Sequence, residues 1–186
     1  EALRQRRMTP EYQAQDKLAC YGLLPESMSH EGYMAHPVHS YWDDFWAARG
    51  FKDAAEMAGL LGMDAQGERI SALCKDFEST LSASLERVIR EHGLDFVPGS
   101  VEFADFDPSA TSIALTVADQ LQHLPRAAID QTYDKYLQGF HTRVSGEVPW
   151  ANYSAYEIRN IGALVRLGRR ADAHALLRFF LGDRRL

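Results

Sequence analysis

The sequence has little cysteine and no long hydrophobic run. Its two cysteines, Cys20 and Cys74, lie far apart and lack the spacing of a zinc site or a disulfide framework. A zinc-protease HExxH motif, a phosphate-binding glycine loop and a GxSxG nucleophile motif are also absent. We therefore expect no metal and no cofactor. No apolar run approaches the roughly 20 residues of a membrane helix, so we expect no membrane span.

An excess of basic charge is missing as well. The chain of 186 residues has a formal net charge of −6. Nucleic-acid binding draws on clustered Lys and Arg that neutralise phosphates. The arginines near both ends are interpreted as solvated helix faces. We expect no nucleic-acid partner.

Strand signals are scarce, because neither alternating hydrophobicity nor Asn-Gly and Asp-Gly hairpin turns occur. Apolar residues instead recur every three or four positions, which is typical of helices. The sequence predicts an all-α fold of antiparallel helical hairpins in a single helical domain, 1–186. The predicted helices cover about 3–18, 37–48, 51–61 and 64–92, with further helices marked by Ile113/Val117/Leu121, Ile129/Tyr133/Tyr136/Phe140, Ile158/Ile161/Val165 and Ala173/Leu176/Phe180.

Three longer connections separate these helices, at 23–37, 94–108 and 145–154. Each is rich in proline, glycine, carboxylates and aromatic residues. Loops of this kind on a helical scaffold commonly carry function. We expect the three connections to face a common cleft.

The stretch HPVHSYWDDFWAARG (36–50) combines indoles with carboxylates. On a helix, His39, Trp42, Asp43 and Trp46 share one face. Such a face suits a sugar, whose C–H groups stack on aromatic rings while its hydroxyls bind carboxylates. We therefore predict that these four residues, together with Tyr41, bind substrate. The alternative is that both indoles are core and that the aspartates stabilise the first helical turn.

Further site residues are predicted in or next to the connections. Glu31, Glu102, Trp150 and Tyr156 are candidate substrate ligands, and Asp105, Asp107 and Glu157 are candidate catalytic carboxylates. Crowded carboxylates repel one another, which favours a protonated acid. Two simpler interpretations remain open. Asp107 before Pro108 is a typical helix N-cap, and Glu157 forms a capping-box pattern with Ser154.

Three stretches resemble the six-hairpin glycosidase superfamily, which includes trehalase- and glucoamylase-like enzymes. They are YWDDFWAARGFKDAAEMAG (41–59), VEFADFDPSATSIAL (101–115) and VPWANYSAYEIRNIGALVRLGR (148–169). The resemblance implies a toroid of six helical hairpins, of which this chain would form all or part of a longer, exported bacterial protein. It also implies a carbohydrate ligand, a binding role for Trp42 and Asp43, and inverting hydrolysis by two carboxylates about 6.5–9.5 Å apart.

The family's second Trp-Asp segment and its late glutamate have no recognisable counterpart here, so a complete acid/base pair is not carried over. Two other hypotheses stay open. The first is a non-catalytic carbohydrate-binding module on the same scaffold. The second is a helical-hairpin scaffold for protein interactions, which the stretch LVRLGRRADAHALLRFF (164–180) favours.

Overall fold

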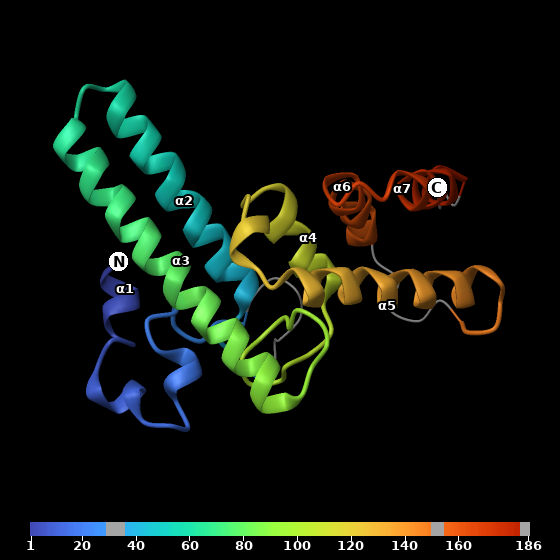
Figure 1. Cartoon of the computed structure of the whole chain (residues 1–186), viewed down its shortest axis with the longest axis horizontal. Helices are drawn as coiled ribbons and strands as arrows, with labels where there is room; N and C mark the ends of the chain where they lie inside the picture. Colours follow the sequence, from blue (N-terminus) through green and yellow to red (C-terminus); the bar gives the residue numbers. More distant parts are fainter. Residues whose placement is uncertain (29–35, 150–154, 183–186) are drawn as a thin grey trace.

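The fold is all-α in the part of the chain that the structure describes, which is residues 1–28, 36–149 and 155–182 of a computed structural model (Figure 1). Isolated bridges pair Ser27 with Val38, Ser40 with Ser100 and Pro98 with Phe106, but these described residues form no strand. The helical elements are α1 (Ala2–Gln5), η1 (Pro10–Gln13), η2 (Leu18–Cys20), α2 (Tyr41–Leu60), α3 (Asp64–His92), α4 (Pro108–Thr116), η3 (Leu121–His123), α5 (Arg126–Val144), η4 (Ala155–Ile158), α6 (Arg159–Arg166) and α7 (Arg170–Gly182).

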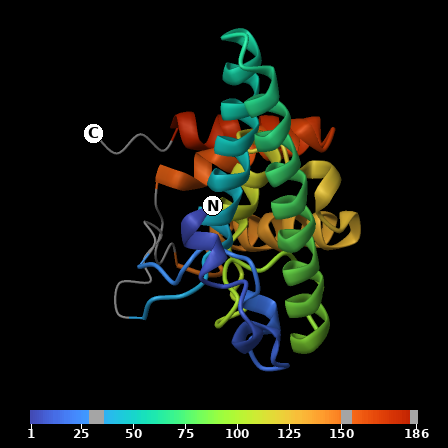
Figure 2. The same ribbon diagram turned by 90° about the vertical axis from the view of Figure 1, so that its left-hand side faces the viewer.

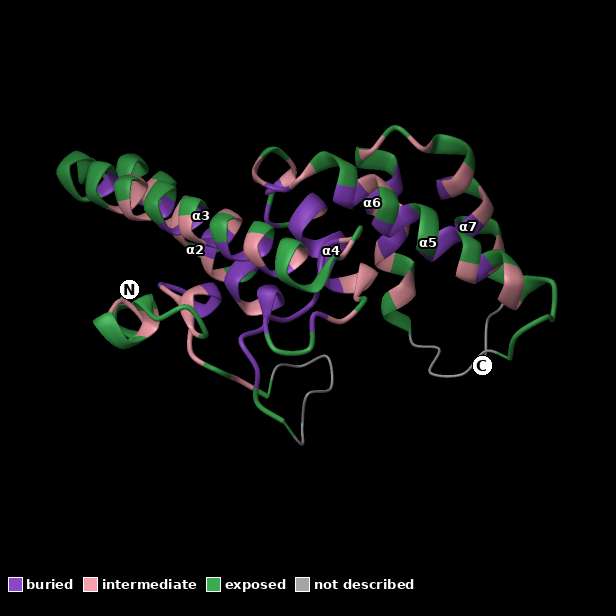
Figure 3. Ribbon diagram, turned by 60° about the horizontal axis from the view of Figure 1, so that its bottom comes forward, coloured by how far each residue is buried: buried purple, intermediate pink, exposed green. Residues whose placement is uncertain are grey.

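The long antiparallel hairpin of α2 and α3 dominates the N-terminal half (Figures 1 and 2). Helix α3 confirms the predicted helix 64–92, and Gly93 ends it in the left-handed conformation, at φ +63°. Phe77, Leu81 and Leu85 are buried along one face of α3, as their spacing predicts. The far end of the hairpin is largely exposed, whereas the end near α4 is buried (Figure 3).

One continuous helix replaces the two that were predicted between Pro37 and Leu61. Gly50 lies within α2, where a glycine costs about 1 kcal/mol relative to alanine, and the packing of α2 along α3 offsets that cost. The start of the helix was also predicted too early. Backbone bonds to the second connection, Val101 N to His39 O at 3.0 Å and Tyr41 N to Gly99 O at 3.0 Å, keep His39 in an extended segment before α2.

The predicted helix 3–18 is wrong, because only α1 and two short 3₁₀ turns form there. Pro10 starts the first of these turns, and it lacks the backbone N–H that a helix interior needs. The N-terminal segment is instead fixed by Arg4, whose side chain is almost completely buried against α3. Its Nε donates to Gly22 O at 2.7 Å, and its Nη2 pairs with Asp76 Oδ2 at 2.7 Å.

The C-terminal helices begin close to where the sequence places them. Asp107 caps α4 and Pro108 is its first residue. Val117 and Leu121 do not continue that helix, because Asp119 adopts φ +53° and turns the chain before η3. Gly168, at φ +76°, separates α6 from α7.

A large cluster of buried side chains joins the two halves, and it includes Leu23, Phe45, Leu115, Tyr133 and Leu176. Helix α6 packs against both α4 and α7, so the last hairpin lies over α4 and α5 (Figure 1). Within the described ranges, no helix combines the length and apolar content needed to cross a membrane.

Candidate functional site

The two indoles of α2 differ in exposure. Trp42 is 8% exposed and packs on Ala110 and Ile113 of α4, whereas Trp46 is 41% exposed. Their ring centroids are 6.1 Å apart with an edge-to-face geometry. Trp42 is therefore partly a core residue, and Trp46 presents its ring to solvent.

Arg159, at the start of α6, joins the indoles to η4, which follows the third connection. Its guanidinium carbon lies 4.9 Å from the Trp42 ring centroid and 4.1 Å from the Tyr156 ring centroid, which are cation–π distances. Tyr156 is 42% exposed. Residues more than a hundred positions apart thus form one aromatic surface at the start of α2. We call Trp42, Trp46, Tyr156, Arg159 and the adjacent Asp43 the indole surface.

The adjacent aspartates of α2 both bind the first connection. Asp43 Oδ2 accepts a hydrogen bond from the Ser27 hydroxyl, and Asp44 Oδ1 accepts one from Leu24 N at 2.9 Å. Asp43 is partly exposed, whereas Asp44 is 1% exposed. Both carboxylates therefore hold the 24–27 segment against α2, and Asp43 also borders solvent beside the indoles.

Asp44 is held in an unusual environment. Burial raises its pKa well above the ordinary value, the Leu24 N–H opposes this, and the charge of Asp43 adds to the rise. Among the described residues, Asp44 Oδ2 has no hydrogen-bond partner. Burial therefore shifts this side chain toward its protonated form compared with an exposed aspartate.

Asp44→Asn is expected to stabilise the protein at pH 7. The folded pKa lies above the unfolded one, so the native state binds more protons and stability falls as pH rises above the ordinary aspartate pKa. The amide stays neutral, so the variant should be more stable than the wild type at pH 7, and the difference should shrink toward pH 4. Urea unfolding of both proteins at several pH values measures this, with Asp16→Asn, at an exposed aspartate, as control. A pH-independent difference would contradict the assignment.

Tyr41 lies in the core rather than on the indole surface. It is 0% exposed, and its hydroxyl lies 2.8 Å from Ser84 Oγ. Burial raises its pKa well above the ordinary tyrosine value. The structure thus separates Tyr41 from the neighbouring indoles and gives it a packing role.

His39, in the extended segment before α2, is bound to Glu102 of the second connection. His39 Nδ1 lies 2.6 Å from Glu102 Oε1, and the His39 backbone N–H donates to Glu102 Oε2 at 2.9 Å. Burial acts to raise the pKa of Glu102, but these bonds from His39 outweigh it and hold the pKa below its ordinary value. The pair lines a groove of about 360 Å³ together with Cys20 and Glu26.

The candidate carboxylates of the second connection have local partners. Asp105 Oδ1 accepts a hydrogen bond from Ser100 Oγ at 2.6 Å. Asp107 Oδ1 accepts the backbone N–H groups of Ser109 and Ala110, both at 2.9 Å. The N-cap interpretation of Asp107 is therefore confirmed, and removal of such a cap costs about 1 kcal/mol.

Glu157 is oriented by two side chains of α5. Arg143 binds it through two bonds of 3.1 Å, and the Tyr136 hydroxyl donates to Glu157 Oε2 at 2.9 Å. These residues line a groove of about 350 Å³ together with Phe106 of the second connection and Val148 of the third. The predicted capping partner Ser154 lies outside the described residues.

Segments in or next to the three connections meet in pairs around the start of α2 and α4. The His39–Glu102 pair joins the segment before α2 to the second connection, Arg159 joins α2 to η4, and the groove of Glu157 joins the second connection to the third. The grooves of His39 and of Glu157 share no lining residue. Two predicted ligands, Glu31 and Trp150, lie outside the described residues, so their place in this arrangement stays a prediction.

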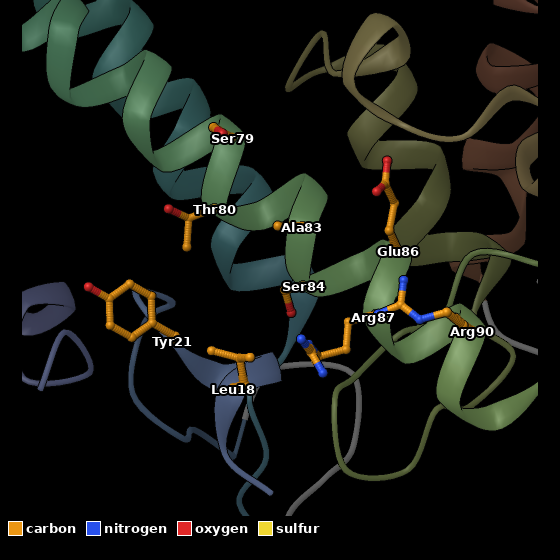
Figure 4. Close-up of a pocket in the computed structure, with 9 residues that line it drawn as sticks. All are labelled: Leu18, Tyr21, Ser79, Thr80, Ala83, Ser84, Glu86, Arg87 and Arg90. Carbon is orange, nitrogen blue, oxygen red and sulfur yellow. The ribbon is translucent and has the colours of Figure 1, made fainter. Parts of the chain in front are cut away.

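A further groove, of about 460 Å³, lies between the η2 segment and α3 (Figure 4). Leu18 and Tyr21 line one side, and polar side chains of α3 that include Arg87 and Arg90 line the other. Arg87 is paired with Glu91 at 2.7 Å. None of the residues predicted from the sequence lines this groove, so it is not part of the candidate site.

Sequence reasoning missed Arg159 and Cys20. The spacing of Tyr156 and Arg159 could have placed them on one helical face. No local pattern connects Cys20 to His39 or Glu102, because the three residues come from different segments. Comparison with known proteins adds nothing to these assignments: no family model matches the chain, and neither a curated protein nor a solved structure is significantly similar to it.

Proposed function

We propose that this chain is a carbohydrate-active, glycoside hydrolase-like domain, built as all or part of an (α/α)₆ toroid. The observation that carries the proposal is the indole surface, where exposed rings adjoin a carboxylate and a guanidinium. Binding sites for small molecules combine aromatic area with a few placed polar groups. A sugar ring can stack on Trp46 and Tyr156 while its hydroxyls bind Asp43 and Arg159.

The groove of Glu157 supports hydrolysis rather than binding alone. Glu157 is fixed by Arg143 and Tyr136 on one side, and Phe106, Pro108 and Ser109 line the same groove. Asp105 and Asp107 flank Phe106 in the chain. In inverting hydrolysis, one carboxylic acid protonates the leaving oxygen and the other carboxylate activates water. Glu157 and one of the two aspartates are our candidates for these roles.

Sugar binding tests the proposal directly. The wild-type chain is titrated with α- and β-linked disaccharides and oligosaccharides of glucose, mannose and galactose, and tryptophan fluorescence is recorded. We expect Trp46→Ala to weaken binding about two- to tenfold, because a stacked ring contributes about 0.5–1.5 kcal/mol. Trp46 is 41% exposed, so the substitution should leave the fold intact.

Leu60→Ala is the matched control, because Leu60 is 81% exposed on the same helix, at the far end from Trp46. Equal sugar affinities of the two variants would contradict the assignment of Trp46. Binding without hydrolysis of any glycoside would favour the non-catalytic module. The absence of any sugar binding would remove both carbohydrate hypotheses and leave the interaction scaffold.

A further inference from the structure

The groove beside η2 contains a group of side chains of the kind that bind transition metals. Cys20 Sγ, a ring nitrogen of His39 and a carboxylate oxygen of Glu102 all lie within 4.8 Å of one another. Cys20 and His39 are 8% and 3% exposed, and the groove they line opens to solvent. Thiolate and imidazole together favour Zn²⁺ and similar ions over Mg²⁺ or Ca²⁺.

The second ring nitrogen of His39 is an independent sign of a ligand. Nδ1 is occupied by Glu102, while the buried Nε2 has no hydrogen-bond partner within the described segments. A buried polar atom of this kind usually has a partner. Glu26 Oε1 lies 3.9 Å from this Nε2, and the other oxygen of Glu26 is paired with Arg7. An ion between Nε2 and Oε1 would satisfy both atoms.

The geometry points to a binding site for a divalent metal ion of the Zn²⁺ class, held by Cys20 Sγ and His39 Nε2 and completed by the Glu26 carboxylate, whose Oε1 lies 3.9 Å from Nε2. Glu102 would position the imidazole through Nδ1, as carboxylates commonly do behind metal-bound histidines. The fourth position would face the groove and hold water.

The charge around Cys20 suits a cation. Glu102 and Glu26 line the same groove as Cys20, and both carry negative charge when ionised. The same two carboxylates attract a divalent ion, which would bind the sulfur as thiolate. On binding, the S–H bond breaks, a sulfur–metal bond forms and one proton passes to solvent.

Cobalt tests the site because a Co²⁺–thiolate bond gives a charge-transfer absorption band. The metal-free chain is titrated with Co²⁺ and then with Zn²⁺. We expect the band to appear with Co²⁺ at a 1:1 ratio and to disappear as Zn²⁺ displaces it, while Mg²⁺ in excess has no effect. Cys20→Ser should abolish the band, and Glu26→Gln should weaken Zn²⁺ binding at least about tenfold.

Cys74→Ser is the matched control, because Cys74 is also a buried free cysteine but contacts the Ala48 carbonyl instead. It should bind Co²⁺ as the wild type does. Circular dichroism on each variant confirms folding, and Zn²⁺ should raise the Tm of the wild type and of Cys74→Ser only. A band that survives Cys20→Ser, or no band with the folded wild-type chain, would overturn the proposal.

Discussion

Asp107→Asn is expected to lower the hydrolytic turnover of the proposed glycosidase by a factor of about 10²–10⁴, the usual contribution of a general acid or base. Sugar affinity should stay close to the wild-type value, because a catalytic carboxylate acts mainly in the transition state. Stability should also be retained. An asparagine oxygen can accept the N–H groups of Ser109 and Ala110 that Asp107 accepts now.

Asp107→Ala separates the two roles of this residue. It removes the carboxylate and the cap together, so it should lose turnover and also about 1 kcal/mol of unfolding free energy. Turnover is measured on the glycoside that the wild type cleaves, and stability by urea unfolding. If Asp107→Asn keeps full turnover, Asp107 is a cap only. The same assay on Asp105→Asn and Glu157→Gln then identifies the carboxylates that act.

Arg4→Ala is expected to lower the free energy of unfolding by about 3 kcal/mol, because it removes several charge-assisted bonds of a buried guanidinium. The side chain bonds Gly22 O, Thr80 Oγ1 at 2.9 Å and Asp76, and it lies over the Phe77 ring at 5.3 Å. Asp76 is exposed, which limits its share. For a chain of this length the change corresponds to a Tm about 10 °C lower.

Arg6→Ala provides the control for this effect. Arg6 is exposed and only two residues away, so its loss should change the Tm by little. Thermal unfolding of the three proteins by circular dichroism gives the comparison. Equal Tm values for Arg4→Ala and the wild type would mean that the N-terminal segment contributes nothing to the stability of the helical core.

The sequence predicts the fold best where local signals agree. Local signals locate α3 and the start of α4, because each signal depends on a few neighbouring residues. These signals are the spacing of apolar residues along α3, Gly93 at its end, and the Asp107–Pro108 pair at the start of α4. Helix α2 was misread, since its start depends on backbone bonds to residues about sixty positions away and its continuity depends on packing against α3. The prediction of two helices treated Gly50 as a helix break, whereas packing against α3 keeps α2 continuous through this residue.

The candidate site was less accessible to prediction for the same reason. Helical spacing placed Trp42 and Trp46 together, and the structure agrees, but it moves His39 off the helix and Tyr41 into the core. The contact of Arg159 with Trp42 and the approach of Cys20 to His39 arise from tertiary folding alone. The residue types indicated which side chains could bind a ligand or take part in catalysis. They did not indicate which of these side chains contact one another in the folded protein.

The length of α2 makes its two ends electrostatically independent. Its 20 residues span about 30 Å, while surface charges are screened over about 8 Å at physiological salt. Charged residues introduced at the exposed Leu60 and Leu61 would therefore change the solubility of the hairpin tip without altering the electrostatic potential at Asp43 and Arg159. Substitutions at the exposed end of the hairpin can thus improve the solubility of the protein, while the indole surface keeps its native electrostatic potential.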